Sequence, residues 1–120
     1  MTARSGVSTL TTHVLDTMLG RPARGIGVTL ERLGDDGDIT KLGAAVTDTD
    51  GRVRDLVGPI EALSTGTYRL RFDTGNYFAA AKRETLYPEI VIVFRVAGVA
   101  QHYHVPLLLS PFGYTTYRGS

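Results

Sequence analysis

Short β-favouring runs, each bounded by glycine or proline, constrain the fold of this chain more than any other feature. The 120 residues include 14 Gly and 5 Pro, and these breakers divide the sequence at short intervals. Short strands separated by frequent turn residues are typical of a β-sandwich or β-barrel. The sequence predicts strands at residues 9–16, 27–32, 39–47, 52–56, 67–72, 89–95, 101–109 and 114–117.

Two of these runs indicate which of their faces are buried. In the run 68–73, the apolar residues Tyr68, Leu70 and Phe72 alternate with charged residues. This period of two predicts one buried face and one solvated face. The run 90–94 is apolar at every position, so we expect a central strand that is covered on both sides.

One segment favours a helix over a strand. Residues 76–84 are rich in helix formers. Thr74 precedes them as the expected N-cap, and Pro88 prevents the helix from continuing. The sequence therefore predicts one short helix in a protein that is otherwise β.

Length and charge limit the classes of protein to which the chain can belong. A length of 120 residues suits one compact domain and not two. We expect a flexible N-terminal segment over residues 1–8 and a single domain over residues 9–120. With 13 Lys+Arg against 12 Asp+Glu, the net charge is +1. This balance gives no electrostatic reason to expect nucleic acid or a membrane as a partner.

Cysteine content and hydropathy limit the compartment. The chain has no Cys, which excludes disulfides and thiolate metal sites. Residues 1–8 lack the apolar core of a signal peptide. The longest apolar run, 90–94, is too short to cross a bilayer. We therefore expect a soluble cytoplasmic protein.

The histidines leave two interpretations open. His102 and His104 form a His-x-His pair, whose side chains share one face of a strand. With His13 as a third ligand, such a pair can bind a divalent metal ion. The plainer alternative is a solvated face beside Tyr103 and Val105, which point inward, with His13 as an ordinary structural residue.

Arg52 and the last four residues are further candidates for a site. Arg52 follows a turn at Asp50-Gly51, which places its guanidinium at the rim of the sheet. One interpretation is that this guanidinium is simply a solvated charge on a turn. The other is that its paired N–H groups donate hydrogen bonds to a planar anion or to a developing oxyanion. Residues 117–120, Tyr-Arg-Gly-Ser, are either a frayed end or part of a site, since Gly119 permits a turn that other residues resist.

Three blocks of sequence resemble the transthyretin-like 5-hydroxyisourate hydrolases of purine catabolism. They are residues 10–23, 47–52 and 103–120, and the aromatic-Pro-Glu pattern at 86–90 adds to them. The terminal tetrapeptide at 117–120 is the most specific part, because hormone-carrying transthyretins lack it. The resemblance implies an eight-stranded transthyretin-like β-sandwich with one short helix, and no cofactor. It also implies a homotetramer, built as a dimer of dimers, with its active sites in a channel at an interface.

The resemblance also implies which residues form the site. Thr115 stands where the family commonly has serine, which keeps a hydroxyl. His102 matches no catalytic position and is interpreted as peripheral. The implied site contains no metal; its catalytic residues are His13, Arg52, His104 and Ser120, and its substrate-binding residues are Tyr117, Arg118 and Gly119.

The implied function is hydrolysis of 5-hydroxyisourate to 2-oxo-4-hydroxy-4-carboxy-5-ureidoimidazoline in urate degradation. A histidine would activate water and Arg52 would stabilise the oxyanion, with the base left open between His13 and His104. Three alternatives remain. They are a transthyretin-like small-ligand binding protein without catalysis, a metal-dependent hydrolase using His13, His102 and His104, and a structural sandwich without a ligand.

Overall fold

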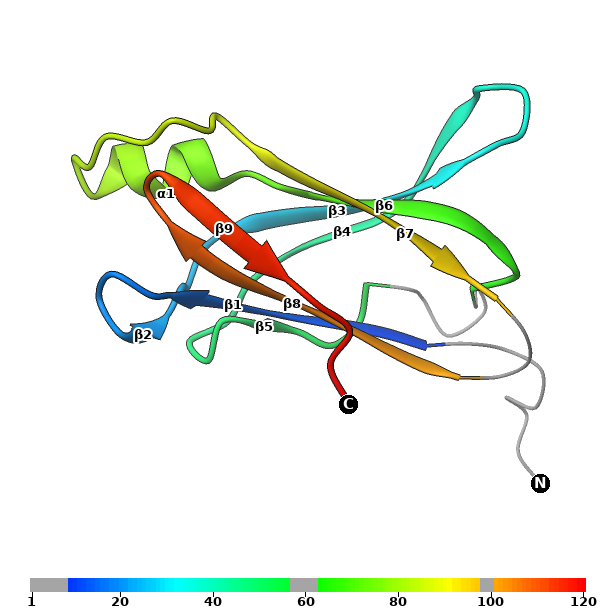
Figure 1. Cartoon of the computed structure of the whole chain (residues 1–120), viewed down its shortest axis with the longest axis horizontal. Helices are drawn as coiled ribbons and strands as arrows, with labels where there is room; N and C mark the ends of the chain where they lie inside the picture. The colour runs from blue at the N-terminus through cyan, green and yellow to red at the C-terminus, as the bar shows by residue number, and fades with distance from the viewer. Residues whose placement is uncertain (1–8, 57–62, 98–100) are drawn as a thin grey trace.

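The protein is a β-sandwich of two facing sheets with one short helix at one end (Figure 1). The computed structural model describes residues 9–56, 63–97 and 101–120. The expected flexible segment at residues 1–8 lies outside the described residues. The predicted all-β sandwich with one short helix is confirmed.

The first sheet is built around the strand that opens the described chain. This strand, β1 (Thr9–Asp16), pairs in parallel with β8 (His102–Ser110). Its other edge pairs antiparallel with two short strands, β2 (Arg21–Pro22) and β5 (Arg52–Val53). An antiparallel β9 (Gly113–Thr116) follows β8, so that the order is β2-β1-β8-β9 with β5 beside β1.

The second sheet is antiparallel throughout. Its order is β4 (Ile39–Val46), β3 (Gly27–Leu33), β6 (Gly66–Phe72) and β7 (Ile90–Val96). The helix α1 (Thr74–Ala80) follows β6 and lies at the end of the sandwich (Figure 1). The described residues thus contain nine strands, because the two-residue β2 adds to the eight that the sequence predicts.

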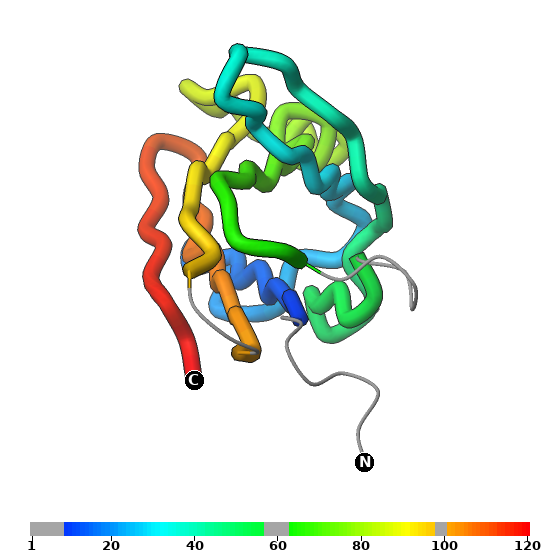
Figure 2. The backbone as a smooth tube through the Cα atoms, turned by 90° about the vertical axis from the view of Figure 1, so that its right-hand side faces the viewer, coloured from blue at the N-terminus to red at the C-terminus, as the bar shows by residue number. Residues whose placement is uncertain are grey.

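The core lies between the two sheets, where every second residue of a strand points inward. On β1, buried positions alternate with partly exposed ones over all eight residues. On β6, the predicted inward face is confirmed, because Tyr68, Leu70 and Phe72 are at most 1% exposed. Seen at right angles to the first view, the two layers curve around this shared interior (Figure 2). The outward positions of β1 and β8 are therefore available for a site.

The prediction of a central, doubly covered strand at 90–94 is wrong. In the described part of the chain, β7 lies at the edge of its sheet and pairs with β6 alone. Ile90 and Ile92 face the core, whereas the side chain of Val93 is 57% exposed. Because this edge strand carries apolar residues on both faces, its outer face is an apolar surface that a single chain leaves uncovered.

The predicted N-cap at Thr74 is also wrong. The capping residue is Asp73, which makes no side-chain capping bond, and Thr74 is the first residue of α1. Thr74 is fully buried, and its Oγ1 has no hydrogen-bond partner among the described residues. The neighbouring Gly75 donates its N–H to the carbonyl of Pro88 at 3.0 Å. This contact docks the first turn against the chain ahead of β7 and turns Thr74 inward.

The helix ends at Ala80, earlier than the sequence predicts. Lys82 takes a positive φ of 56°, which interrupts helical geometry. The next residue, Arg83, donates its N–H to the carbonyl of Phe78 at 2.9 Å. This turn directs the Arg83 side chain to Asp16 at the end of β1, with 2.7 Å between Nη1 and Oδ2.

Candidate functional site

Parallel pairing of β1 with β8 brings together polar side chains that are 93 residues apart in sequence. Thr9 lies opposite His102, and Thr11 lies opposite His104. Because residues at alternate positions share a face of a strand, these four side chains and His13 point outward from the same side of the sheet.

The turn before β5 places Arg52 beside His13. The two residues are direct partners in the β1–β5 pair. Asp48 Oδ1 accepts a hydrogen bond from the backbone N–H of Arg52 at 3.0 Å, which holds the turn in shape. Gly51 has a φ of 73°, and a Cβ there would overlap the carbonyl oxygen of Val14. Only glycine fits this position without strain, so the predicted turn at 50–51 is confirmed.

A hollow of about 320 Å³ opens where these elements meet. It combines β1, β5, β8 and the end of the chain in a single surface. The hollow is lined by Thr11, Thr12, Arg52, Val53, Arg54, His102, His104 and Ser120.

His13 lies next to this hollow and is not part of its lining. It is flanked by Arg52 on β5 and by Pro106 on β8. It is also close enough to His104 for the charges of the two rings to interact. The structure thus brings together four predicted catalytic residues, with Arg52, His104 and Ser120 in the hollow and His13 beside them.

The last two residues reach His104. Gly119 donates its backbone N–H to the carbonyl of His104 at 2.8 Å. Its α-carbon lies so close to the imidazole that a Cβ there would be 2.5 Å from Cδ2 of His104. Ser120 follows in the lining of the hollow.

Tyr117 and Arg118, which precede Gly119 and Ser120, turn to the other side of the sheet. The guanidinium carbon of Arg118 lies 4.4 Å from the ring centroid of Tyr103, which is buried, a cation–π contact. Arg118 also donates to the side-chain oxygen of Gln101 at 2.8 Å. Tyr117 is 54% exposed and lines a separate hollow together with Arg118. Within one chain, the structure does not bring Tyr117 and Arg118 into the hollow that holds His104.

The surroundings of His13 and His104 favour the neutral form of both imidazoles. Burial lowers the pKa of His13 and of His104, and the positive charge of Arg52 lowers both further. The pKa of His104 is also lowered by the neighbouring His102 and His13, while hydrogen bonding to the backbone of Asp50 opposes the shift at His13. A neutral imidazole keeps one nitrogen lone pair, so both residues are able to accept a proton near neutral pH.

His102 is not peripheral to the hollow. Its Nδ1 lies 2.7 Å from Thr9 Oγ1 and its Nε2 lies 3.0 Å from Thr11 Oγ1. The same Thr11 oxygen lies 2.7 Å from Nδ1 of His104. Thr9 and Thr11 were not among the site residues predicted from the sequence. The signal was the Thr-x-Thr-x-His spacing at 9–13, which puts two hydroxyls on the face that carries His13.

The structure does not arrange the three histidines as a metal-binding group. Across residues 9–56, 63–97 and 101–120, no group of three or more His, Cys, Asp or Glu side chains is placed to hold a metal ion. Both ring nitrogens of His102 are engaged by threonine hydroxyls. The metal-binding alternative for His13, His102 and His104 therefore has no support in the arrangement of these residues.

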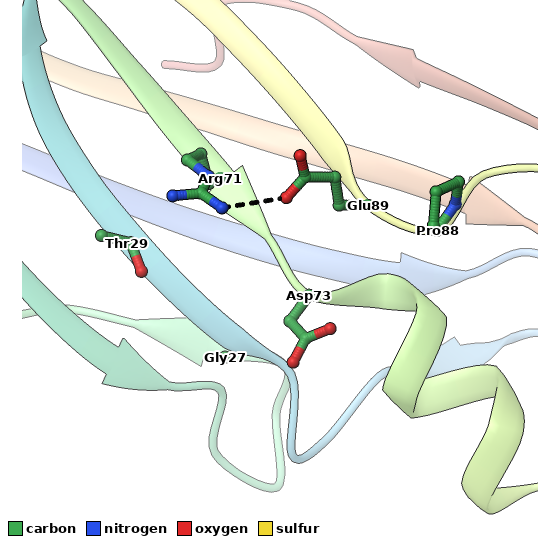
Figure 3. A pocket seen from close by; sticks show the side chains of 6 residues that line it. All are labelled: Gly27, Thr29, Arg71, Asp73, Pro88 and Glu89. Atoms are coloured by element: carbon green, nitrogen blue, oxygen red, sulfur yellow. Dashed lines mark hydrogen bonds and ion pairs between the residues drawn. The ribbon is translucent and has the colours of Figure 1, made fainter. Parts of the chain in front are cut away.

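A second hollow, of about 530 Å³, lies by the opposite sheet (Figure 3). Arg71 and Glu89 form an ion pair of 3.2 Å in it, and Asp73 accepts a hydrogen bond from Asn76 at 2.6 Å. Arg71 and Glu89 are paired with each other, Asp73 is bound to Asn76, and no histidine lines this hollow. It is a weaker candidate for acid–base chemistry; its lining is Gly27, Thr29, Arg71, Asp73, Pro88 and Glu89.

Comparison with known proteins defines the class to which this fold and site belong. The profile of the HIUase/Transthyretin family matches residues 10–119, and the chain belongs to this family.

Within that family, the chain is similar to proteins named 5-hydroxyisourate hydrolase. The one from Salmonella typhi is 46% identical over 120 residues, covering 100% of this chain and 87% of that protein. The structure of the 5-hydroxyisourate hydrolase of Klebsiella pneumoniae has a TM-score of 0.82 at 39% identity, covering 94% of this chain and 99% of that one. Sea bream transthyretin in complex with thyroxine has a TM-score of 0.87 at 30% identity, covering 92% and 94%.

Proposed function

We propose that this chain hydrolyses 5-hydroxyisourate to 2-oxo-4-hydroxy-4-carboxy-5-ureidoimidazoline, a step of urate degradation. The observation that carries the proposal is the hollow in which Arg52, His104 and Ser120 meet beside His13. Relatives named for this activity match nearly the whole chain. The polar groups of the hollow supply what ring hydrolysis needs.

The reaction adds one water molecule across an acyl carbon–nitrogen bond of the six-membered ring. The water oxygen bonds to the acyl carbon, the carbon–nitrogen bond breaks, and the acyl carbon ends as a carboxylate. A base takes a proton from the attacking water, and the departing nitrogen receives a proton. Between these steps, the tetrahedral intermediate carries an oxyanion that must be stabilised. The proposed route uses no cofactor.

Each group has a role that fits its place. His104 is assigned as the base because it lines the hollow, and its lowered pKa keeps it neutral. His13 positions the water or returns a proton to the leaving nitrogen. Arg52 holds the substrate and stabilises the oxyanion. Ser120 orients the substrate.

We also propose a homotetramer, arranged as a dimer of dimers. In the described part of the chain, β7 and β9 lie at open sheet edges. Val93 on β7 and Tyr114 on β9 are 57% and 43% exposed. Open edges with apolar side chains favour pairing with another chain. In such an assembly Tyr117 and Arg118 would reach the site of another chain, and their substrate-binding role stays a prediction.

Light scattering at micromolar protein concentration tests the proposed tetramer and should report the mass of four 13.0 kDa chains.

Ring opening of fresh substrate tests the proposed activity. 5-Hydroxyisourate is generated in situ from urate, and its ultraviolet absorbance is followed with and without the protein. We expect decay to accelerate in proportion to the protein concentration. Decay at the rate of buffer alone would remove the hydrolase assignment.

A second candidate function, small-ligand binding without catalysis, is favoured by one comparison. The sea bream transthyretin that this fold resembles was solved with thyroxine. Titration of this chain with thyroxine by calorimetry separates the two candidates. Saturable binding together with unaltered 5-hydroxyisourate decay would favour the binding protein.

The close approach of Gly119 to His104 gives a prediction for turnover. In Gly119→Ala, the new methyl would lie 2.5 Å from Cδ2 of His104 and 3.3 Å from Cγ of Pro106, so the imidazole must move. We expect kcat to fall on the order of 10- to 100-fold, since misplacing a catalytic group by about 1 Å has an effect of this size. The control is Gly113→Ala, whose methyl would meet Ser110 Oγ at an ordinary 3.7 Å. Equal kcat values for the two variants would contradict the prediction.

The cellular location remains a prediction. Within the described residues, no helix combines the length and the apolar character that crossing a bilayer requires. The cytoplasmic location expected from the sequence is to be tested by fractionating cells that produce the untagged protein.

A further inference from the structure

Three hydrogen bonds join four side chains of β1 and β8 into one row that ends at His104. Thr9 Oγ1 lies 2.7 Å from His102 Nδ1, and His102 Nε2 lies 3.0 Å from Thr11 Oγ1. Thr11 Oγ1 then lies 2.7 Å from His104 Nδ1. The two imidazoles are nearly parallel, at 13° with centroids 6.5 Å apart. The parallel register of the two strands produces this row, because it sets Thr9 opposite His102 and Thr11 opposite His104.

The number of hydrogens in this row couples the two imidazoles. A hydroxyl has one hydrogen, and a neutral imidazole carries one N–H. Thr11 Oγ1 contacts a nitrogen of each ring and can donate its one hydrogen to only one of them, so at least one ring must donate an N–H to it. The proton positions of the two rings are linked in one case: when Nε2 of His102 accepts the Thr11 hydrogen, His104 must donate to Thr11 from Nδ1.

In two polarities of the row Thr11 donates to one of the rings, and in a third arrangement it accepts from both rings. In the first, His104 donates Nδ1–H to Thr11, Thr11 donates to Nε2 of His102, and His102 donates Nδ1–H to Thr9. In the second, every hydrogen bond is reversed, and His104 carries its proton on Nε2. The first polarity leaves the Nε2 lone pair of His104 free to take a proton, as does the arrangement in which Thr11 accepts from both rings, whereas the second polarity does not.

We propose that Thr11 and His102 are positioning residues that hold His104 in the tautomer protonated at Nδ1. This inference rests on the proposed hydrolase function, in which His104 acts as the base. Thr11 is the one hydrogen-bond partner that the described chain provides for the His104 ring. The hydroxyl of Thr11 thus acts on His104 as a carboxylate acts on the histidine of a catalytic triad, by fixing tautomer and orientation.

The first polarity also suits the protonated state of His104. When Nε2 accepts a proton, Nδ1–H continues to donate to Thr11, and no other hydrogen bond in the row changes. In the second polarity Nε2 already carries a proton, so His104 must change its tautomer before it can accept a proton at that atom. The charged or titratable groups that act on the His104 ring are Arg52, His102 and His13, and each of them lowers its pKa.

The direct test is the tautomer of His104, read from the ring nitrogen shifts of ¹⁵N-histidine-labelled protein by NMR. At a pH where His104 is neutral, we expect a protonated Nδ1 and an unprotonated Nε2. In Thr11→Val, which keeps the branched shape without the hydroxyl, the proton should shift toward Nε2. Thr11→Ser should restore the wild-type pattern. A protonated Nε2 in the wild type would overturn the proposal, whether or not the protein hydrolyses 5-hydroxyisourate.

Kinetics give the second readout. Thr11→Val should lower kcat about 10-fold or more, with a much smaller change in KM, because general-base catalysis is worth at least that much. Thr29→Val on the opposite sheet is the matched control and should change neither value.

A separate variant tests the role of His102. In His102→Leu, the Thr11 hydroxyl loses its acceptor, so the population with Nδ1–H on His104 should fall. An unchanged tautomer in His102→Leu would remove His102 from the row and overturn its part of the proposal.

Discussion

Replacing Arg52 with alanine should lower kcat for 5-hydroxyisourate by about 100-fold or more, the usual loss when an oxyanion donor is removed. Arg52 lines the hollow and lies directly opposite His13. The turn that carries it is held by Asp48 and by the left-handed Gly51, which the substitution leaves intact. The variant should therefore fold like the wild type, and the loss should lie in the chemical step.

The same variant should also change the dependence of rate on pH. The charge of Arg52 contributes to lowering the pKa of both His13 and His104. Without that charge, each imidazole takes up a proton at higher pH. The acidic limb of the rate profile should thus move to higher pH in Arg52→Ala.

Two control variants separate charge from geometry. Arg52→Lys keeps the positive charge but loses the planar fork of donors, so it should restore the pH profile and only part of kcat. Arg24→Ala, at an exposed position, should match the wild type in both. Wild-type turnover by Arg52→Ala would show that Arg52 is a solvated turn charge.

The largest effect on stability is expected at Asp16, the residue that ends β1. Its carboxylate is fully buried and accepts hydrogen bonds from Arg83, Tyr77 and the N–H of Leu19, at 2.7, 2.7 and 3.0 Å. Asp16→Ala leaves these donors without their acceptor, and Arg83 becomes a mostly buried, unpaired charge. Breaking a buried pair in this way costs roughly 3–5 kcal/mol of unfolding free energy. Chemical denaturation at a fixed protein concentration measures it.

Paired substitution isolates the role of the ion pair. If the unpaired charge dominates, Asp16→Ala combined with Arg83→Met should lose less stability than Asp16→Ala alone. Asp35→Ala, in an exposed turn, should change stability by less than about 0.5 kcal/mol. A loss in Asp16→Ala as small as that of Asp35→Ala would refute the account.

The contribution of Asp16 should depend on pH. Burial raises the pKa of its carboxyl, but hydrogen bonds from Arg83, Tyr77 and Leu19 outweigh burial and hold that pKa below its usual range. A carboxyl with a lowered folded-state pKa stabilises the fold above its unfolded-state pKa, and this stabilisation is lost as the pH falls toward the folded value. The difference between wild type and Asp16→Ala should therefore shrink below about pH 4.

Local patterns in the sequence predicted most of the fold. The alternation at Tyr68, Leu70 and Phe72 depends only on the period of a strand, and it is confirmed. Whether a strand is central or at an edge depends on which distant strands pair with it. For this reason the apolar run at 90–94 was assigned to the wrong place in its sheet.

The site depended still more on long-range pairing. The turn at Gly51 placed Arg52 correctly, because turn geometry is local. The meeting of Thr11 with His104 follows from the parallel register of β1 and β8, which no local pattern specifies. The contact of Arg118 with Tyr103 depends on a different pair, the antiparallel β8 and β9 with the bridge between His104 and Gly119. The residues alone gave candidates for a site, and only the family resemblance joined them.

In the proposed mechanism, the outer face of β1 and β8 carries a water-activating pocket in which His104 is the base. The most direct measurement is the rate at which His104→Ala opens freshly generated 5-hydroxyisourate, with circular dichroism and light scattering confirming the wild-type fold and mass. We expect decay no faster than in buffer, beside rapid decay with the wild type. A folded His104→Ala protein that keeps wild-type turnover would contradict the proposed mechanism.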